Sequence, residues 1–488
     1  MNTLEQLHHI APAVALLAGA AVVLGADLLT DRRVASQWLA LLALVVAAAM
    51  TFWQVVAGIN GQSALGGAVV VDEFSLYFSF LLIATTAAVV IVSSDGLARV
   101  EQRGEYYALL LTSTGAMVLL VQAQDLIMIF VALETTSIVQ FVLAGIARDD
   151  RSSEAGLKYL LTGAISAAVL LYGFAFLFGL AGTTSLAGIA AFVGTGAEET
   201  RLAVILAFVL VAAGLGFKMA IVPFQAWVPD VYQGSPTPVT TFLSVASKAA
   251  GFAVVLRVFY TGLGGGDTFI SEDWAKMFAV FAAVSMTFGN VAAMQQTDVK
   301  RLLGYSSIAQ AGNIAVGMAA VAAGSTLGPA AVLFFLGTYA ATNLGAFICV
   351  IIVSNRIGSD EIGDYAGLLR RSPGVAIVLT LCLLSLTGIP PTAGFLAKVY
   401  IFNSAAQTGH DWLVWLVVVA VLNTAISAYY YLRWARTMLL DEPQDETVFQ
   451  PSGATGGLLA LAALGVLFLG FVPTPLIEAA RRAAETLV

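Results

Sequence analysis

The chain contains one long apolar run after another, and no other feature limits its fold as strongly. About fourteen runs of roughly 18 residues or more follow each other between short polar loops. Only 11% of the 488 residues are charged and 59% are hydrophobic, with a mean hydropathy of +0.90, so most of the chain must lie in lipid. The approximate limits of the runs are 10–29, 35–58, 73–94, 105–121, 124–146, 157–180, 201–224, 238–261, 274–295, 303–323, 329–353, 374–405, 411–437 and 455–478.

These runs predict membrane-spanning helices rather than the strands of a barrel. Barrel strands alternate polar and apolar residues over segments of about ten residues, whereas these runs are long and continuous. We therefore predict an all-α membrane protein with about fourteen transmembrane helices. The N-terminus, MNTLEQLHH, lacks the positive segment of a secretory signal, so the first run is expected to remain as a span.

The distribution of Lys and Arg predicts the orientation in the membrane. The loops after odd-numbered spans hold most of these residues, and the positive-inside rule places such loops in the cytoplasm. Both termini are then expected on the outer side. The cytoplasmic group is Arg32, Arg33, Arg99, Arg103, Arg148, Arg151, Lys158, Lys300, Arg301, Arg356, Arg370, Arg371, Arg433 and Arg436, and the outer group is Arg201, Lys276, Arg481 and Arg482. Arg257 lies near a span end, where it is expected to snorkel, and we assign it no role.

Four ionisable side chains lie inside the apolar runs. They are Glu134, Lys218, Lys248 and Lys398. A charge at bilayer depth costs at least about 2.5 to 3.5 kcal/mol on insertion scales, so such groups usually face a bundle interior or a hydrated path that conducts ions or protons. The sequence therefore predicts a proton or cation conduit.

Prolines interrupt two of the lysine-containing spans. Pro223 cannot donate to the carbonyl of Met219. The consecutive prolines at 390–391 leave the carbonyls of Leu386 and Thr387 without their usual partners. Interrupted helices in membranes line cavities. Two breaks at corresponding places in two groups of five spans also predict inverted repeats. The expected division is 1–104 for spans 1 to 3, 105–262 and 263–438 for the two repeats, and 439–488 for the last helix.

The buried charges could work as a relay. A lysine out of water loses its proton more readily, and a nearby carboxylate opposes that loss, so Glu134 and Lys218 form a switchable pair. Opening the pair would pass a proton to Lys248 and then to Lys398. The alternative is that Glu134 and Lys218 merely hold two helices together. Glu154 and Lys158 are auxiliary candidates, although an exposed i,i+4 pair explains them as well.

Four stretches resemble a known family. GFKMAIVPFQAWVPDVYQGSPTPVTTFLSVASK, residues 216–248, is similar to the signature of subunit N of respiratory complex I, the proton-pumping NADH-quinone oxidoreductase. Three further stretches also resemble this family, namely DLIMIFVALE, DVKRLLGYSSIAQAG and LTGIPPTAGFLAKVYIF. The resemblance covers essentially the whole chain. Related antiporter-like subunits typically have an AH-type sequence where this chain has Asp230, Val231 and Tyr232, so the resemblance is specific to subunit N. Asp230 is a further auxiliary candidate.

The resemblance implies a subunit without a redox centre, built from two inverted five-helix repeats. It implies that Glu134 and Lys218 are the paired switch, that Lys248 is the central relay and that Lys398 faces the exit path. No cofactor is expected in this chain, whereas flavin, iron–sulfur clusters and quinone are expected in partner subunits. The implied partners are the other membrane and peripheral subunits of complex I, notably neighbouring antiporter-like subunits, in a bacterial cytoplasmic membrane.

The chain departs from the family at two positions. Gln225 and Gln310 stand where the family often has histidine, and a glutamine orders water but does not exchange protons. Any relay is then expected to use lysine, glutamate and water. Two alternatives remain, an Mrp-type cation/proton antiporter and a non-conducting scaffold subunit. We find no metal or nucleotide motif and no basic run for nucleic acid.

Overall fold

A computed structural model of the chain describes residues 3–29, 33–97, 100–195, 198–264, 268–443 and 445–487. The α-helices are α1 Thr3–His9, α2 Ala11–Leu29, α3 Arg33–Val56, α4 Glu73–Gly96, α5 Arg103–Gln122, α6 Leu126–Ala144, α7 Asp150–Ala181, α8 Leu186–Gly194, α9 Arg201–Met219, α10 Val228–Gly234, α11 Thr237–Phe242, α12 Lys248–Leu256, α13 Ser271–Ala293, α14 Val299–Ala322, α15 Gly328–Ile357, α16 Leu368–Arg371, α17 Pro373–Thr387, α18 Ala393–Ala406, α19 Asp411–Leu440, α20 Gly453–Phe471 and α21 Thr474–Glu485. The π-helical segments are η3 Leu243–Ser247 and η4 Arg257–Gly262, and the 3₁₀ segments are η1 Leu65–Gly67, η2 Glu198–Thr200 and η5 Ile362–Tyr365. Strands β1 Gln62–Ala64 and β2 Val69–Val71 pair antiparallel.

The structure confirms the all-helical membrane class. Each of the fourteen predicted runs coincides with helix, and twelve of the described helical segments are long and apolar enough to cross a membrane. The other two predicted spans are α14, which contains more polar residues, and the broken pair α17 and α18. The predicted last span is too long at its end, because α20 stops at Phe471 and α21 is a separate helix that begins after Pro473.

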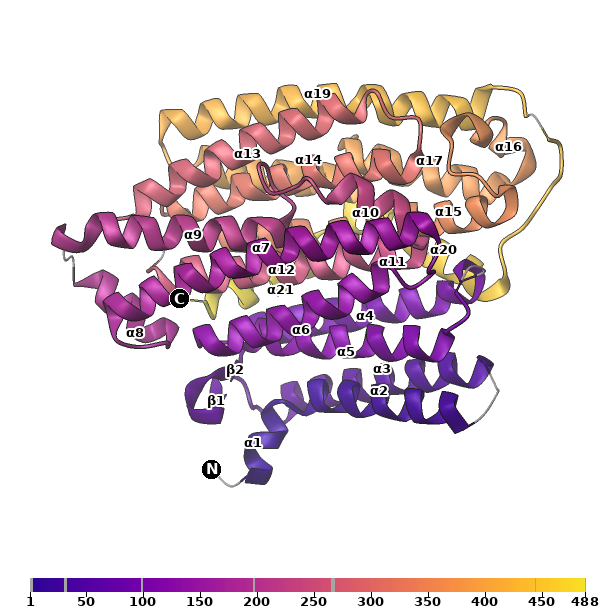
Figure 1. The fold of residues 1–488 in the computed structure, drawn as a ribbon. Coiled ribbons are helices and arrows are strands. Elements are labelled where there is room, and N and C mark those ends of the chain that lie inside the picture. Colours follow the sequence, from indigo (N-terminus) through magenta and orange to yellow (C-terminus); the bar gives the residue numbers. More distant parts are fainter. Residues whose placement is uncertain are drawn as a thin grey trace.

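The long helices lie roughly parallel in one bundle (Figure 1). Helices α2 and α3 form one edge, α13 and α19 form the opposite edge, and α11 and α12 lie between them. Helix α14 and the segment Thr237–Gly262 are almost wholly buried. The strands, α8 and the end of α21 lie at one end of the bundle, and α16 lies at the other. Arg32 and Arg99, counted above for orientation, lie outside the described residues.

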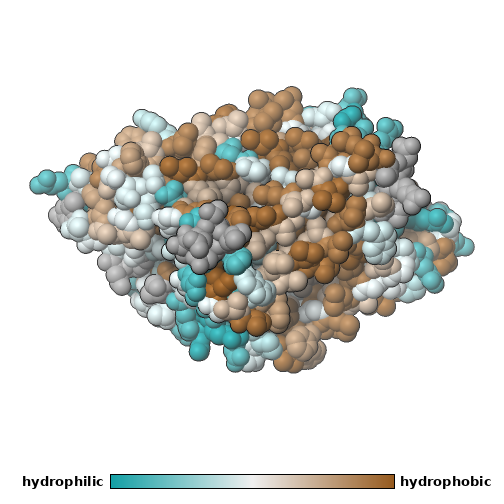
Figure 2. All heavy atoms as spheres, turned by 90° about the horizontal axis from the view of Figure 1, so that it is seen from below, coloured by the Kyte–Doolittle hydropathy of each residue, from teal (hydrophilic) through white to brown (hydrophobic). Residues whose placement is uncertain are grey.

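The surface has the apolar belt that a lipid-facing bundle requires. Figure 2 shows hydrophobic residues over the middle of the face seen there and hydrophilic residues gathered toward the two ends. Exposed side chains on α3 that no other part of the chain covers include Trp38, Leu42, Val45 and Phe52. Such a large exposed apolar surface is consistent with contact to lipid or to another membrane subunit.

Both predicted helix breaks are confirmed. Helix α9 ends where Ala220 adopts a left-handed conformation at φ 61°, and the N–H of Ile221 donates to the carbonyl of Gly216 at 3.2 Å. Helix α17 ends in the same way, with Gly388 at φ 90° and the N–H of Ile389 donating to the carbonyl of Leu384 at 3.0 Å. This six-to-one hydrogen bond is typical of a helix end that is followed by a residue in the left-handed conformation.

Arg257 does not snorkel, so that prediction is wrong. Its side chain is 1% exposed, and Nη2 lies 2.6 Å from Oδ1 of Asp72, whose carboxylate also caps α4. The guanidinium donates to the carbonyl of Val121 at 3.2 Å and lies 4.5 Å from the ring centre of Phe74. These contacts join the start of η4 to α4 and α5. Arg257 cannot reach water because the elements packed around this end of the span enclose its side chain.

Removal of one partner of this ion pair should destabilise the protein strongly. Asp72→Ala leaves the Arg257 charge buried and unpaired, which typically costs about 3 to 5 kcal/mol. We expect a lower thermal midpoint and less assembled protein in membranes than for Glu101→Ala, a change at an exposed carboxylate. The double variant Asp72→Leu with Arg257→Met should recover much of the loss, and an Asp72→Ala protein as stable as wild type would contradict the assignment.

Candidate functional site

The three interior lysines and Glu134 lie on four different elements of the bundle. Lys218 is at the end of α9, Lys248 begins α12, and Lys398 lies in α18 just beyond the second helix break. These lysines are 3%, 2% and 5% exposed, respectively, whereas Glu134 on α6 is only half-buried. Charges this deeply buried need hydrogen-bond partners from the protein.

Lys218 binds neutral partners on α6. Its Nζ donates to Oγ of Ser137 at 3.0 Å and to Oε1 of Gln140 at 2.9 Å. Although Glu134 is near enough to interact electrostatically with Lys218, the ion pairs between described residues do not include these two. The predicted switchable pair is therefore open in this structure.

Lys248 is held by α14. Its Nζ donates to the carbonyl of Ser307 at 2.5 Å and also to the Ser307 hydroxyl, and it lies 5.5 Å from the ring centre of Tyr339. The hydroxyls of Tyr232 and Tyr339 lie 3.3 and 3.4 Å from Oγ of Ser307. Lys248 follows directly after η3, and π-helical turns of this kind often occur at functional sites.

The carbonyls freed at the second break are bound by site side chains. Lys398 Nζ donates to the carbonyl of Thr387 at 2.8 Å and lies 3.5 Å from Oγ1 of Thr424. Nε2 of Gln310 donates to the carbonyl of Leu386 at 2.9 Å. The sequence identified both carbonyls as unpaired, and the structure places one buried lysine and one of the two unusual glutamines on them.

The two glutamines differ in their surroundings. Besides its bond to α17, Gln310 accepts a hydrogen bond from Nδ2 of Asn313 at 3.2 Å through Oε1. Gln225 is half-buried, and its Oε1 has no hydrogen-bond partner among the described residues. Gln310 thus joins two helices directly.

The auxiliary candidates belong to a charged network at one end of the bundle. Lys158 lies 2.7 Å from Glu154, as the i,i+4 spacing predicts, and also 2.8 Å from Asp230. Arg301 approaches the other oxygen of Asp230 at 2.6 Å. The Glu154–Lys158 interpretation as an isolated exposed pair is therefore incomplete, because the network ties α7 to α10 and α14.

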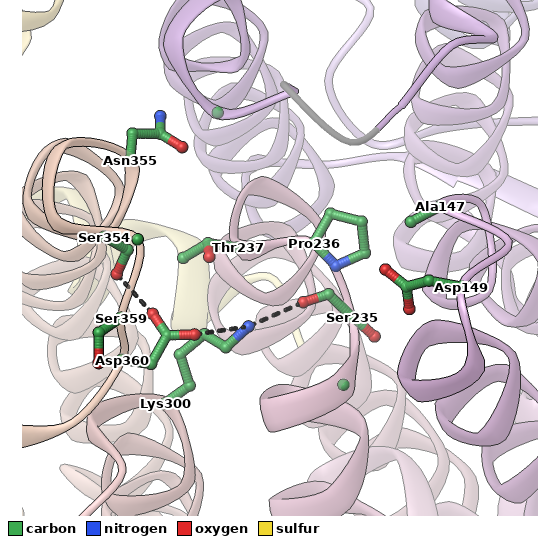
Figure 3. Close-up of a pocket in the computed structure, with 13 residues that line it drawn as sticks. Ala147, Asp149, Ser235, Pro236, Thr237, Lys300, Ser354, Asn355, Ser359 and Asp360 are labelled. Atoms are coloured by element: carbon green, nitrogen blue, oxygen red, sulfur yellow. Dashed lines mark hydrogen bonds and ion pairs between the residues drawn. The ribbon is translucent and has the colours of Figure 1, made fainter.

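A polar cavity of about 190 Å³ lies at the same end (Figure 3). Lys300 points between the carbonyl of Ser235, at 3.1 Å, and Oδ2 of Asp360, at 3.4 Å. Asp149 and Asn355 also line the cavity. Lys300 lies seven residues before Ser307 on α14, and the loop that lines the cavity leads into α11 and η3. The cavity therefore lies at the ends of the elements that hold Lys248.

Several partners of the lysines were not anticipated from the sequence. They are Ser137, Gln140, Ser307, Tyr339 and Thr424. Polar residues within apolar spans were the available signal, but such residues are too numerous here to select without their contacts. Among the described residues no cluster of His, Cys, Asp and Glu could hold a metal ion, and Cys349 and Cys382 are buried free thiols.

Known proteins share both the sequence and the fold. The family described as NADH:quinone oxidoreductase/Mrp antiporter, TM, matches residues 123–424. NADH-quinone oxidoreductase subunit N of Dehalococcoides mccartyi is 41% identical over 98% of this chain and 99% of its own length. NAD(P)H-quinone oxidoreductase subunit 2 of Synechococcus sp. is 42% identical over 86% of this chain and 80% of its own length.

Two solved structures have the same fold as this chain. A chain of respiratory complex I from Thermus thermophilus with bound aureothin is 31% identical, with a TM-score of 0.79 over 96% of this chain and 98% of that one. A chain of the Mrp complex from Dietzia sp. is 22% identical, with a TM-score of 0.85 over 100% and 98%, which shows a shared fold alone.

Fold, helix breaks and interior lysines thus define a multi-pass membrane protein of the antiporter-like class. Within that class, the chain belongs to the family of NADH-quinone oxidoreductase subunit N.

Proposed function

We propose that this chain is the proton-translocating subunit N of a NADH-quinone oxidoreductase. Protons would move through Glu134, Lys218, Lys248 and Lys398 with the help of intervening hydroxyls and water, coupled to quinone reduction in other subunits. The chain itself would contribute no redox centre, while flavin, iron–sulfur clusters and quinone would bind to partner subunits. Neighbouring antiporter-like subunits would cover part of its apolar surface.

One observation supports this proposal above all. The direct hydrogen bonds of all three interior lysines go to neutral oxygens rather than to a carboxylate. A purely structural Glu134–Lys218 link would be expected as a closed ion pair, because a buried charge is costly without its counter-charge. An ammonium bound by neutral groups can release its proton with less opposition, as a relay requires.

The two alternatives make different predictions. The match to the Mrp complex shows the shared fold, so an Mrp-type antiporter remains the second candidate, while the 41% identity to a subunit N favours the first. A respiratory subunit should copurify with flavin and iron–sulfur proteins. A non-conducting scaffold subunit should tolerate loss of its interior lysines.

Replacement of Lys218 tests the relay. Lys218→Ala should assemble at near-normal levels and lower proton-coupled quinone reduction on the order of tenfold, because it removes a titrating group. Lys276→Ala is the matched control, since Lys276 is 58% exposed in an i,i+4 pair with Glu272. Proton uptake and quinone reduction in membrane vesicles are the measurements, and normal coupled turnover in assembled Lys218→Ala would exclude the relay role.

The order of severity among variants tests the route. Lys248→Ala should be severe, because it removes the only proposed titratable link between Lys218 and Lys398. Gln310→Ala should slow turnover only modestly, since it removes a donor to the Leu386 carbonyl without removing a protonation site. Coupled rates of the two variants, compared at equal assembly, decide the question. A larger loss for Gln310→Ala would mean that the lysine-centred route is wrong.

The orientation is also a proposal. We infer that the end with α16 faces the cytoplasm and that both termini face outward, because most basic loop residues lie after odd-numbered spans. The two five-helix repeats, 105–262 and 263–438, would then have opposite topologies.

Cysteine labelling tests this topology. Single cysteines at Arg148 and Arg370 should react with an impermeant reagent only from the cytoplasmic side, and one at Glu199 only from outside. The native Cys349 and Cys382 are buried and should give little background. Labelling of all three positions from the same side would overturn the proposed orientation.

A further inference from the structure

The buried side-chain amide of Gln140 forms hydrogen bonds with Lys218 and with three other side chains around it. Oε1 of Gln140 accepts from Nζ of Lys218 at 2.9 Å, from Oγ of Ser247 at 2.9 Å and from the hydroxyl of Tyr159 at 3.2 Å. Its Nε2 donates to Oγ of Ser113 at 3.2 Å. Gln140 is fully buried, and its four partners come from α9, η3, α7 and α5.

This arrangement fixes the orientation of the amide. Because a lysine ammonium can only donate, it must face the carbonyl oxygen, so Nε2 is left to face Ser113. A carbonyl oxygen has two lone pairs, whereas three donors converge on this one. The three donors therefore compete, and departure of Lys218 leaves the oxygen satisfied by Ser247 and Tyr159.

Helix α6 thus presents two acceptors of different strength to Lys218. Glu134 and Gln140 are six residues apart, which corresponds to roughly 9 Å along the helix axis. Ser137 lies between them and also accepts from Lys218. A lysine side chain has four flexible methylene groups, so in the proposed switch its ammonium would move between such sites by rotation of the side chain.

We propose that Gln140 is the positioning residue that holds Lys218 in its open position, beside the segment that leads to Lys248. This inference rests on the proposed relay and gives it a second docking site for the lysine. In the closed position the ammonium would contact Glu134. In the open position it contacts Gln140, whose oxygen also binds Ser247, the residue directly before Lys248.

The neutrality of Gln140 is the essential property. A carboxylate carries the opposite charge to the ammonium, so it would bind the ammonium more strongly than a neutral acceptor does and would retain its proton. An amide holds the ammonium in place but opposes its deprotonation less. The titratable groups on the elements packed around this site include Glu134 on α6, Tyr159 on α7 and Lys248 on α12.

The decisive variant is Gln140→Glu. It keeps the size and shape of the side chain, and all four neighbours can donate to a carboxylate, so the fold should tolerate it. We expect coupled quinone reduction in membrane vesicles to fall about tenfold near neutral pH. The pH optimum should move upward by roughly 1 unit or more, because an adjacent opposite charge keeps the lysine protonated to higher pH.

Two further variants control for structural damage. Gln140→Asn retains an amide on a shorter side chain and should lower the rate less, with an unchanged pH optimum. Gln54→Met removes a different fully buried amide, which binds the carbonyls of His8 and His9 far from the lysines, and should leave both rate and optimum unchanged. Assembly of each variant is measured by its content in the purified complex.

The outcomes separate this inference from the proposed function. If Gln140→Glu assembles and shows the wild-type rate and pH optimum while Lys218→Ala lowers coupled turnover as expected, Gln140 does not position the lysine but the relay stands. If Gln140→Glu fails to assemble, Gln140→Asn decides: an assembled Gln140→Asn complex with the wild-type rate would likewise mean that Gln140 does not position the lysine. If Lys218→Ala leaves coupling intact, both proposals are wrong.

Discussion

Hydrocarbon offers no hydrogen-bond partner, and the interior of this protein is arranged around that constraint. Each helix break frees carbonyl groups that only protein or enclosed water can satisfy. At the second break, Lys398 and Gln310 bind the carbonyls of Thr387 and Leu386. At the first, the carbonyl of Phe217 accepts from the N–H of Ala220 and also from Nε1 of Trp227, each at 3.2 Å. The break in a span and the polar side chain beside it therefore form one structural unit.

In the proposed relay, the neutral partners of the lysines would allow the ammonium groups to release their protons more easily. A carboxylate would bind each ammonium tightly, whereas hydroxyl, amide and carbonyl oxygens bind it less strongly. Helix α14 is central to this arrangement, since Ser307 binds Lys248 and Gln310 binds the end of α17. A displacement of α14 would thus reach two parts of the proposed route together.

The region outside the lysine sites is held by a different kind of contact. The pair of Asp72 and Arg257 is closed, fully buried and reinforced by the carbonyl of Val121. It ties η4, which follows α12, to α4 and α5. A tight ion pair there and open contacts around Lys218 are consistent with a rigid frame around a site whose charges would move in the proposed relay.

The sequence alone determined the class of protein, the approximate positions of its long helices and the residues of the proposed relay. It could do so because apolar length fixes a membrane span, because proline removes a backbone donor, and because a lysine within hydrocarbon is too costly to be incidental. Sequence similarity then identified the family from the stretch that contains Lys218 and Lys248.

Only the tertiary structure decided which atoms those residues meet. Gln140 is six residues from Glu134 but over seventy from Lys218, and no local pattern brings its oxygen to that ammonium. Arg257 looked free to reach water because a span end is defined by the sequence, whereas its burial depends on α4 and α5, which are far away in the chain. Local propensity and hydropathy act over one helix, but the partner of a buried charge is set by the packing of several.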